Sequence, residues 1–331
     1  MTVKWNVAGR RAIAGVAMCV CLLASSCGGS STSKTKFIPV RVVSFGDESS
    51  MIIDLNNDSN GNKFTVNATV SSTDQNVVCG LSAIWNQSVA ASFGLVFPEC
   101  NPGSTAVTAP VSRIRATRGA RAVDLGPQID AQQADSPLGE GDMATLLIGE
   151  NDIVAQYLLY PTLSEVELTA NVEAAGIEVG RQLNRLADLG AKILVATIPD
   201  LGLTPFGYAE RAAHADTDRG ALLSRLSQNF NAKLRATMYN DGRRIGLILL
   251  DELVQTTAAH PGLNGINNSS VAVCDLAQSK LTPPSSLDCT MQTLIPDGNA
   301  TYFWADDRHL SASGQNIFGS AAITRAQNNS F

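Results

Sequence analysis

Four short runs of apolar and β-branched residues recur along the chain and predict buried β-strands. They cover residues 40–45, 144–148, 191–197 and 244–251. Between them lie longer segments in which apolar residues return every three or four positions, the spacing of one helix face. The predicted helices cover residues 80–95, 124–134, 164–190 and 221–238, and a last helix follows Gly314. Strands separated by helices of this length form βαβ units, which predicts an α/β fold with a parallel sheet.

Residues 54–62 and 256–300 show neither period, whereas residues 64–70 show the strand period. Residues 54–62 are dense in Asn, Asp, Ser and Gly, which predicts a surface loop. Residues 64–70 alternate between apolar and polar side chains and predict a short strand. Residues 256–300 are rich in turn formers, and because long loops often shape binding sites, we expect substrate contacts there.

The start of the chain has the pattern of a bacterial export signal. Lys4, Arg10 and Arg11 precede an apolar run over residues 12–24, and small residues then lead to Cys27. The apolar run is too short to span a membrane. Small residues directly before a cysteine resemble a lipobox, which would make Cys27 the lipidated first residue of the mature protein. A plain cleaved signal peptide is the alternative.

The chain therefore divides into three parts. Residues 1–27 are the predicted signal peptide, residues 28–37 a flexible tether rich in Gly, Ser, Thr and Lys, and residues 38–331 a single domain. We expect an exported cell-envelope lipoprotein, attached to the membrane through lipidated Cys27 and acting as a monomer.

The composition excludes one class of partner. The net charge is −6, no basic stripe is present, and only 5% of residues are aromatic. Nucleic-acid binding needs basic patches and commonly aromatic stacking surfaces, so no nucleic acid is expected as a partner.

The cysteines fit an oxidising compartment. Cys79, Cys100, Cys274 and Cys289 remain after the predicted signal segment. Four cysteines allow three pairings, and the short intervening loops favour Cys79–Cys100 and Cys274–Cys289. The rival interpretation, a zinc site, lacks a close Cys-x-x-Cys pair, so we expect no metal.

Chemically useful side chains follow the predicted strands. Gly46 and Asp47 end the first strand, and Asn151 follows the strand at 144–148. An Asn amide at this edge can donate a hydrogen bond to a developing oxyanion, and Gly119 allows a ligand oxygen to approach the backbone closely. Near the end of the chain, the spacing of Asp306 and His309 puts a carboxylate within reach of an imidazole.

These blocks, taken in order, resemble the SGNH, or GDSL, hydrolase family. They are Phe45-Gly46-Asp47, Gly119, Gly149-Glu150-Asn151-Asp152, Pro199-Asp200-Leu201-Gly202-Leu203-Thr204-Pro205 and Asp306-Asp307-Arg308-His309. The resemblance extends over residues 41–322. It implies a flavodoxin-like three-layer α/β/α sandwich and a serine ester hydrolase without cofactor or metal. The implied substrate is an ester or acylated small molecule, glycan or lipid.

The resemblance also implies the roles of individual residues. His309 would take the proton of a nucleophilic serine while Asp306 orients it, and Gly119 and Asn151 would hold the oxyanion. In the family the serine directly follows Gly-Asp, whereas here Glu48 does. An extra residue in the turn would give Ser49 the role of nucleophile, with Ser50 as the second choice.

In the alternative, Glu48 itself fills the position and pairs with His309, which raises the pKa of the imidazole and removes the base. The protein would then be a catalytically impaired pseudo-hydrolase that binds an acylated ligand.

Overall fold

The computed structural model describes residues 36–329 and 331. The predicted signal peptide and lipobox Cys27 lie outside the described residues, as does most of the predicted tether. Residues from Lys36 to Phe331 form one compact unit.

Five parallel strands form the central sheet. They are β1 (Arg41–Gly46), β2 (Arg113–Ile114), β3 (Asp142–Leu147), β4 (Lys192–Ala196) and β5 (Ile245–Ile248). Their order is β2-β1-β3-β4-β5, and every neighbouring pair is parallel. This order is that of flavodoxin-like folds, so the predicted fold class is confirmed.

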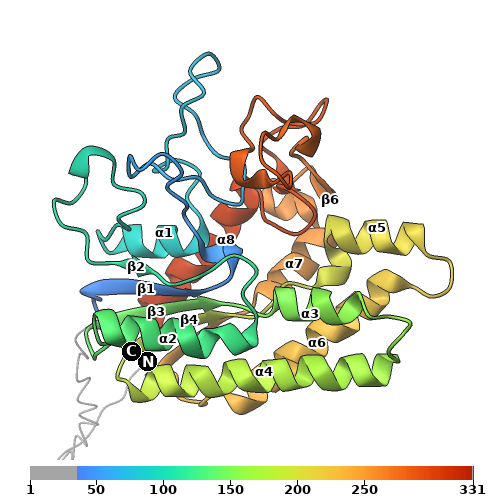
Figure 1. The fold of residues 1–331 in the computed structure, drawn as a ribbon, viewed down its shortest axis with the longest axis horizontal. Coiled ribbons are helices and arrows are strands. Elements are labelled where there is room, and N and C mark those ends of the chain that lie inside the picture. Colours follow the sequence, from blue (N-terminus) through green and yellow to red (C-terminus); the bar gives the residue numbers. More distant parts are fainter. Residues whose placement is uncertain (1–35, 330) are drawn as a thin grey trace, which may run out of the picture. The chain divides into compact units, whose positions relative to one another are not determined.

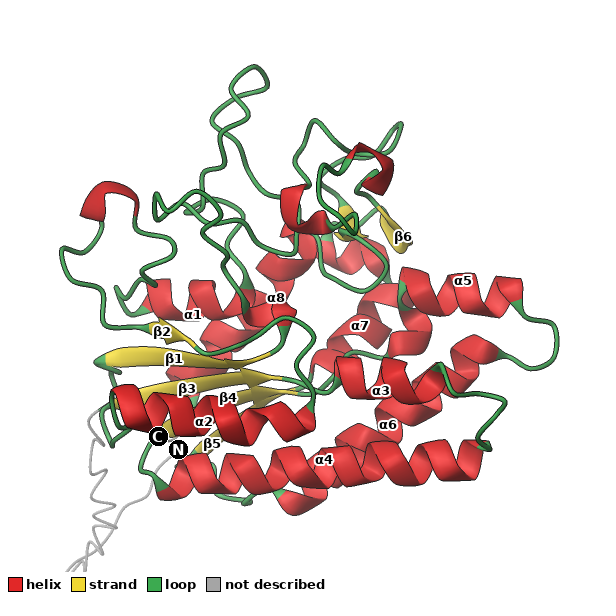
Figure 2. Cartoon of the chain, in the orientation of Figure 1, coloured by secondary structure: helices red, strands yellow, loops and turns green. Residues whose placement is uncertain are grey.

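Helices cover both faces of the sheet (Figures 1 and 2). On one face lie α1 (Trp85–Ser92) and α8 (Ala312–Asn328), which pack against each other. On the other lie α2 (Leu125–Asp135), α4 (Glu165–Asp188) and α6 (Arg219–Thr237), with α4 packed along α6. The remaining helices are α3 (Glu150–Tyr157), α5 (Pro205–Ala213) and α7 (Leu250–Ala259). The apolar faces of these elements bury a continuous core around the sheet.

The loops carry a second, smaller sheet. Strands β6 (Asn268–Ala272) and β7 (Tyr302–Trp304) pair in parallel within the loop-rich region. The predicted strand at 64–70 is wrong, because this segment makes only isolated bridges, at Asn67 and Thr69. The predicted strand at 244–251 ends early, because Leu250 already begins α7.

Two disulfides staple the loops, and they are the favoured pairs Cys79–Cys100 and Cys274–Cys289. They indicate an oxidising, extracytoplasmic compartment. Among the described helices, none has both the length and the apolar character that a bilayer span requires.

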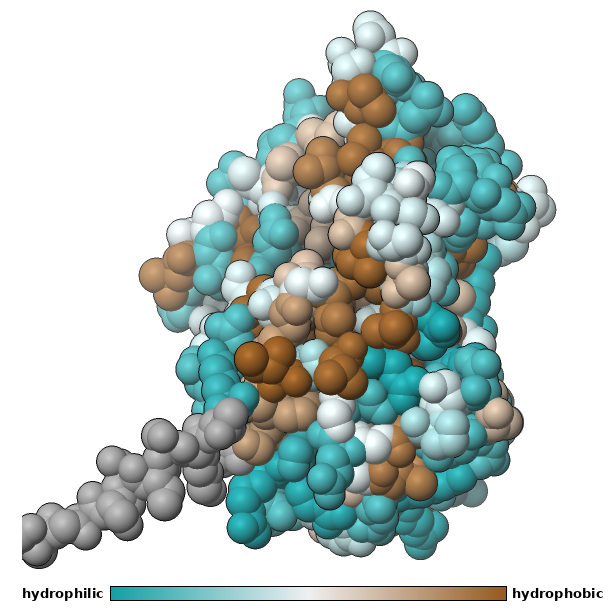
Figure 3. Space-filling model, turned by 90° about the vertical axis from the view of Figure 1, so that its left-hand side faces the viewer, coloured by the Kyte–Doolittle hydropathy of each residue, from teal (hydrophilic) through white to brown (hydrophobic). Residues whose placement is uncertain are grey.

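A side view shows apolar surface running between polar margins (Figure 3). Part of the apolar surface of the molecule lines a groove of about 320 Å³ next to Cys100. The groove is lined by residues of α1, among them Gln87 and Ala91, and by residues of the following loop, among them Phe97 and Ala106.

Candidate active site

The turn after β1 is fixed by Gly46 and Asp47. Gly46 has φ of 129°, and a Cβ atom there would lie 2.0 Å from the carbonyl oxygen of Leu147, so only glycine fits. Asp47 then caps the short 3₁₀ helix Glu48–Ser50, because its Oδ1 accepts the N–H of Ser49 at 3.0 Å. This capped turn determines which way Glu48 and Ser49 point.

Glu48 lies at the carboxyl edge of the sheet, in contact with two hydrogen-bond donors. Its Oε2 accepts the N–H of Gly119 at 2.8 Å and the side-chain amide of Asn151 at 3.1 Å. Gly119 comes from the loop after β2 and is exposed, whereas Asn151 lies in the first turn of α3. The two donors that the sequence assigns to an oxyanion therefore bind the carboxylate of Glu48.

His309 is held by Asp306 on the loop before α8. The Nδ1 atom of His309 lies 2.9 and 2.8 Å from the two carboxylate oxygens of Asp306. Asp306 also accepts the backbone N–H groups of Arg308 and His309, at 3.0 and 2.7 Å, and the hydroxyl of Ser286. These bonds fix the carboxylate, so the imidazole is oriented with Nε2 directed away from Asp306.

That Nε2 atom faces Glu48. It lies 3.9 Å from Oε1 of Glu48, which is an ion-pair distance but too long for a hydrogen bond. Both side chains are more than nine-tenths buried. Within the described part of the chain, Nε2 of His309 is buried and has no hydrogen-bond partner.

The charges explain the protonation of the pair. Burial alone would lower the pKa of His309, but Asp306, then Glu150 and Glu48, raise it to about 10. Burial opposes ionisation of Glu48, yet the cationic His309 and the donors of Gly119 and Asn151 hold the pKa of Glu48 below its ordinary value. At neutral pH the pair is an imidazolium facing a carboxylate.

Glu150 and Arg308 form a second buried ion pair near His309. Glu150 is 3.3 Å from Arg308, and burial raises the pKa of Glu150 to about 7 against the attraction of Arg308. Burial also raises the pKa of Asp47, and the neighbouring Glu48 and Glu150 add to that shift. Burial, together with the surplus of carboxyl groups over cations in this cluster, therefore disfavours the ionised forms of Asp47 and Glu150.

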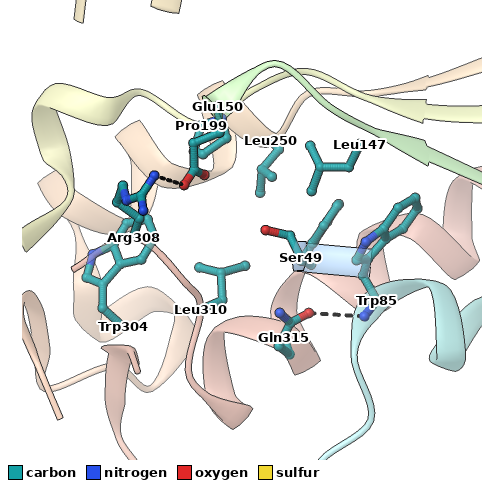
Figure 4. Close-up of a pocket in the computed structure, with 11 residues that line it drawn as sticks. Ser49, Trp85, Leu147, Glu150, Pro199, Leu250, Trp304, Arg308, Leu310 and Gln315 are labelled. Carbon is teal, nitrogen blue, oxygen red and sulfur yellow. Dashed lines mark hydrogen bonds and ion pairs between the residues drawn. The ribbon is translucent and has the colours of Figure 1, made fainter. Parts of the chain in front are cut away.

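Among the described residues, Ser49 is not hydrogen-bonded to His309. It lines a small cavity of about 20 Å³, room for about one water molecule, across from the pair formed by Glu150 and Arg308 (Figure 4). The hydroxyl of Ser50 is buried and accepts the indole N–H of Trp85 at 3.2 Å. The structure therefore brings Gly119, Asn151, Asp306 and His309 together around Glu48 and places both serines outside that group.

Phe64 covers His309, and Arg118 in turn lies over Phe64. The ring of Phe64 lies 5.1 Å from the imidazole, and the guanidinium of Arg118 lies 5.4 Å from the Phe64 ring. Sequence reasoning missed both residues, and also Ser286 and Glu150. Only Glu150 had a usable signal, since it directly precedes Asn151; the others reach the site from loops without a recognisable pattern.

Similarity to known proteins is found among solved structures. No family model matches it, and no curated protein matches it. Among solved structures, it is similar to protein YxiM from Bacillus subtilis, with a TM-score of 0.35 and 14% sequence identity. The match covers 87% of this chain and 56% of YxiM, so the chain spans little more than half the length of that protein.

Proposed function

We propose that this protein is a hydrolase with the site arrangement of the SGNH family, in which the carboxylate of Glu48 takes the place of the nucleophilic serine. One observation carries the proposal: Glu48 binds both oxyanion donors, Gly119 and Asn151, and faces His309 at 3.9 Å. In the family that the sequence resembles, the serine has these neighbours.

The serine ester hydrolase predicted from the family resemblance is not favoured by this geometry. A serine route needs a neutral imidazole in contact with the hydroxyl. Here the pKa of His309 is about 10, so the imidazole holds its proton at neutral pH. Its Nε2 atom, which does not contact Asp306, faces the carboxylate of Glu48. No hydrogen bond joins Ser49 to His309 among the described residues, and the cap by Asp47 holds the turn that carries Ser49.

A carboxylate such as Glu48 cannot hydrolyse carboxylic esters by the route that a nucleophilic serine uses. Attack of a carboxylate on an ester carbonyl gives a tetrahedral intermediate from which the carboxylate leaves more readily than the alkoxide, because the carboxylate is far less basic. The intermediate returns to the starting ester. We therefore expect the protein to be inert towards simple carboxylic esters.

Binding of an acylated ligand without turnover is the second candidate. The observation that favours it is the ion pair, because an imidazole that keeps its proton and faces Glu48 cannot act as the base that turnover requires. An acyl carbonyl would then have to displace Glu48 from Gly119 and Asn151.

Glu48→Ser tests the proposed position of the nucleophile. The variant removes the carboxylate and puts a hydroxyl beside His309, so we expect a gain of p-nitrophenyl acetate hydrolysis and labelling at position 48 by a fluorophosphonate probe. The wild-type protein should show neither. Glu48→Gln is the matched control, because it removes the charge without supplying a nucleophile, and adding His309→Ala to Glu48→Ser should abolish labelling.

Two results would overturn the proposal. Labelling of Ser49 or Ser50 in the wild-type protein would restore the serine ester hydrolase. A folded Glu48→Ser variant that stays unlabelled would show that position 48 is not the nucleophile position.

A further inference from the structure

The two oxygens of Glu48 have different surroundings. Oε2 accepts hydrogen bonds from Gly119 and Asn151. Oε1 receives no hydrogen bond from another residue among those described, and it is the oxygen that faces His309. A carboxylate held by one oxygen offers the lone pairs of the other to a reacting atom, which is how carboxylates act as covalent nucleophiles in enzymes.

A proton is placed next to that free oxygen. The Nε2 atom of His309 is buried without a hydrogen-bond partner, 3.9 Å from Oε1, while Asp306 binds the opposite side of the ring. Buried donors are almost always paired, so an unpaired one in a site points to a group supplied by a ligand. The missing group is an acceptor that lies against His309 and next to Oε1.

We propose that Glu48 attacks a saturated carbon that carries an oxygen leaving group, such as an epoxide, and that His309 protonates the departing oxygen. This inference rests on the proposed function, because it requires Glu48 to hold the nucleophile position. It names the substrate class for the same site.

The first step consumes the resting proton. A lone pair of Oε1 forms a bond to the carbon, the carbon–oxygen bond of the epoxide breaks, and the released alkoxide takes the proton of His309. The products are a hydroxyalkyl ester of Glu48 and a neutral imidazole. His309 thereby becomes the base that the resting site lacks.

The second step is hydrolysis of that ester. Water gives a proton to His309 as its oxygen attacks the ester carbonyl, and the alkoxide of the diol then leaves with the same proton. Glu48 emerges as a carboxylic acid, passes its proton to His309 and returns to the resting ion pair. The sum is epoxide plus water giving a diol.

The two donors fit this second step. After attack through Oε1, the carbonyl oxygen of the ester is Oε2, which already lies on Gly119 and Asn151. Charge that develops on Oε2 during hydrolysis is therefore stabilised without rearrangement. Gly119 is itself exposed, so this donor lies at the surface of the protein.

A single-turnover reaction of the full-length protein with styrene oxide in oxygen-18 water tests the inference. Covalent attack transfers one oxygen-18 atom into Glu48 and leaves the diol unlabelled in that turnover, as peptide mass spectrometry would show. Asn151→Ala should slow hydrolysis of the ester about 10²–10³-fold and so accumulate the styrene oxide adduct on Glu48. Asn171→Ala, at an exposed amide on α4, is the matched control and should accumulate none.

The outcomes separate this inference from the proposed function. If Glu48→Ser gains ester hydrolysis but the wild-type protein gives no diol, no labelled Glu48 and no adduct in Asn151→Ala, the substrate class is wrong and the nucleophile position stands. Oxygen-18 in the diol with unlabelled Glu48 would also overturn the covalent step. If Glu48→Ser stays inert while folded, both proposals fail.

Discussion

The N–H of Gly119 donates a hydrogen bond of 2.8 Å to the carboxylate of Glu48, across 71 positions of sequence. A carboxylate of the protein thus occupies the backbone donor that the family resemblance assigns to an oxyanion. The resting site contains its own anion. Its chemistry depends on how that anion and the facing imidazole share protons.

Glu48→Gln should lower the pKa of His309 from about 10. The substitution keeps an acceptor for Gly119 and Asn151 but removes one of the negative charges that stabilise the imidazolium. Asp306 and Glu150 remain, so we expect the pKa of His309 to stay above its ordinary value of 6.5. NMR titration of the imidazole, assigned by comparison with His309→Gln, measures the shift. An unchanged pKa would mean that Glu48 does not face the ring in solution.

The stability of the fold should depend on the proton of His309. The pKa of His309 is raised on folding, from 6.5 to about 10, so its contribution is complete below pH 6.5 and is lost as the pH rises through 10. The unfolding free energy of the wild-type protein minus that of His309→Gln should therefore fall across this window, by on the order of a few kcal/mol. Urea unfolding at a series of pH values checks the slope, and a difference independent of pH would contradict the assignment.

Gly46→Ala should be strongly destabilising. The added Cβ atom would meet the carbonyl oxygen of Leu147 at 2.0 Å, and the φ of 129° is unfavourable for any residue with a side chain. We expect a loss of about 3 kcal/mol or more in unfolding free energy. Gly80→Ala is the control, since nothing lies within 4 Å of its Cβ position and its φ is not positive. Equal losses in the two variants would show that the turn after β1 is not constrained in this way.

The sequence could predict the sheet and most of the residues that meet at its edge. Apolar runs mark strands that are buried on both faces, and the carboxyl ends of parallel strands converge, so motifs placed there come together. Gly119 and Asn151, which follow β2 and β3, meet for this reason, whereas Asp306 and His309 follow β7 of the smaller sheet and could be recognised only by their spacing before the last helix. The two-residue strand β2 is too short to produce a pattern, and it could not be predicted.

The direction of Ser49 could not be predicted either. One step along a helical turn rotates a side chain by about 100°, so the group that faces His309 depends on the backbone of a three-residue turn. The cap by Asp47 determines that backbone, and the cover of Phe64 over His309 depends on a loop far away in sequence. Contacts of this kind arise from tertiary packing, which a local pattern does not contain.

Lys63 gives a pH dependence of opposite sign. Its side chain is fully buried beside the Cys79–Cys100 disulfide, and its Nζ donates to the carbonyl oxygens of Cys79 and Leu81 at 2.7 and 2.9 Å. No ion pair with a carboxylate is present among the described residues, and burial lowers the pKa of Lys63 to about 7. The folded state therefore disfavours the charged amine that the unfolded chain carries up to its ordinary pKa of 10.5.

Comparison with Lys63→Met isolates this effect. Because the pKa of Lys63 is lower in the folded state, its contribution to stability is least favourable below pH 7 and improves as the pH rises towards 10.5. The unfolding free energy of the wild-type protein minus that of Lys63→Met should rise across this window, whereas the corresponding difference for His309→Gln falls. Urea unfolding at pH 6, 8 and 10 compares the two slopes within one protein. A flat or falling difference for Lys63→Met would mean that the buried amine keeps its charge through contacts with the two carbonyl groups alone.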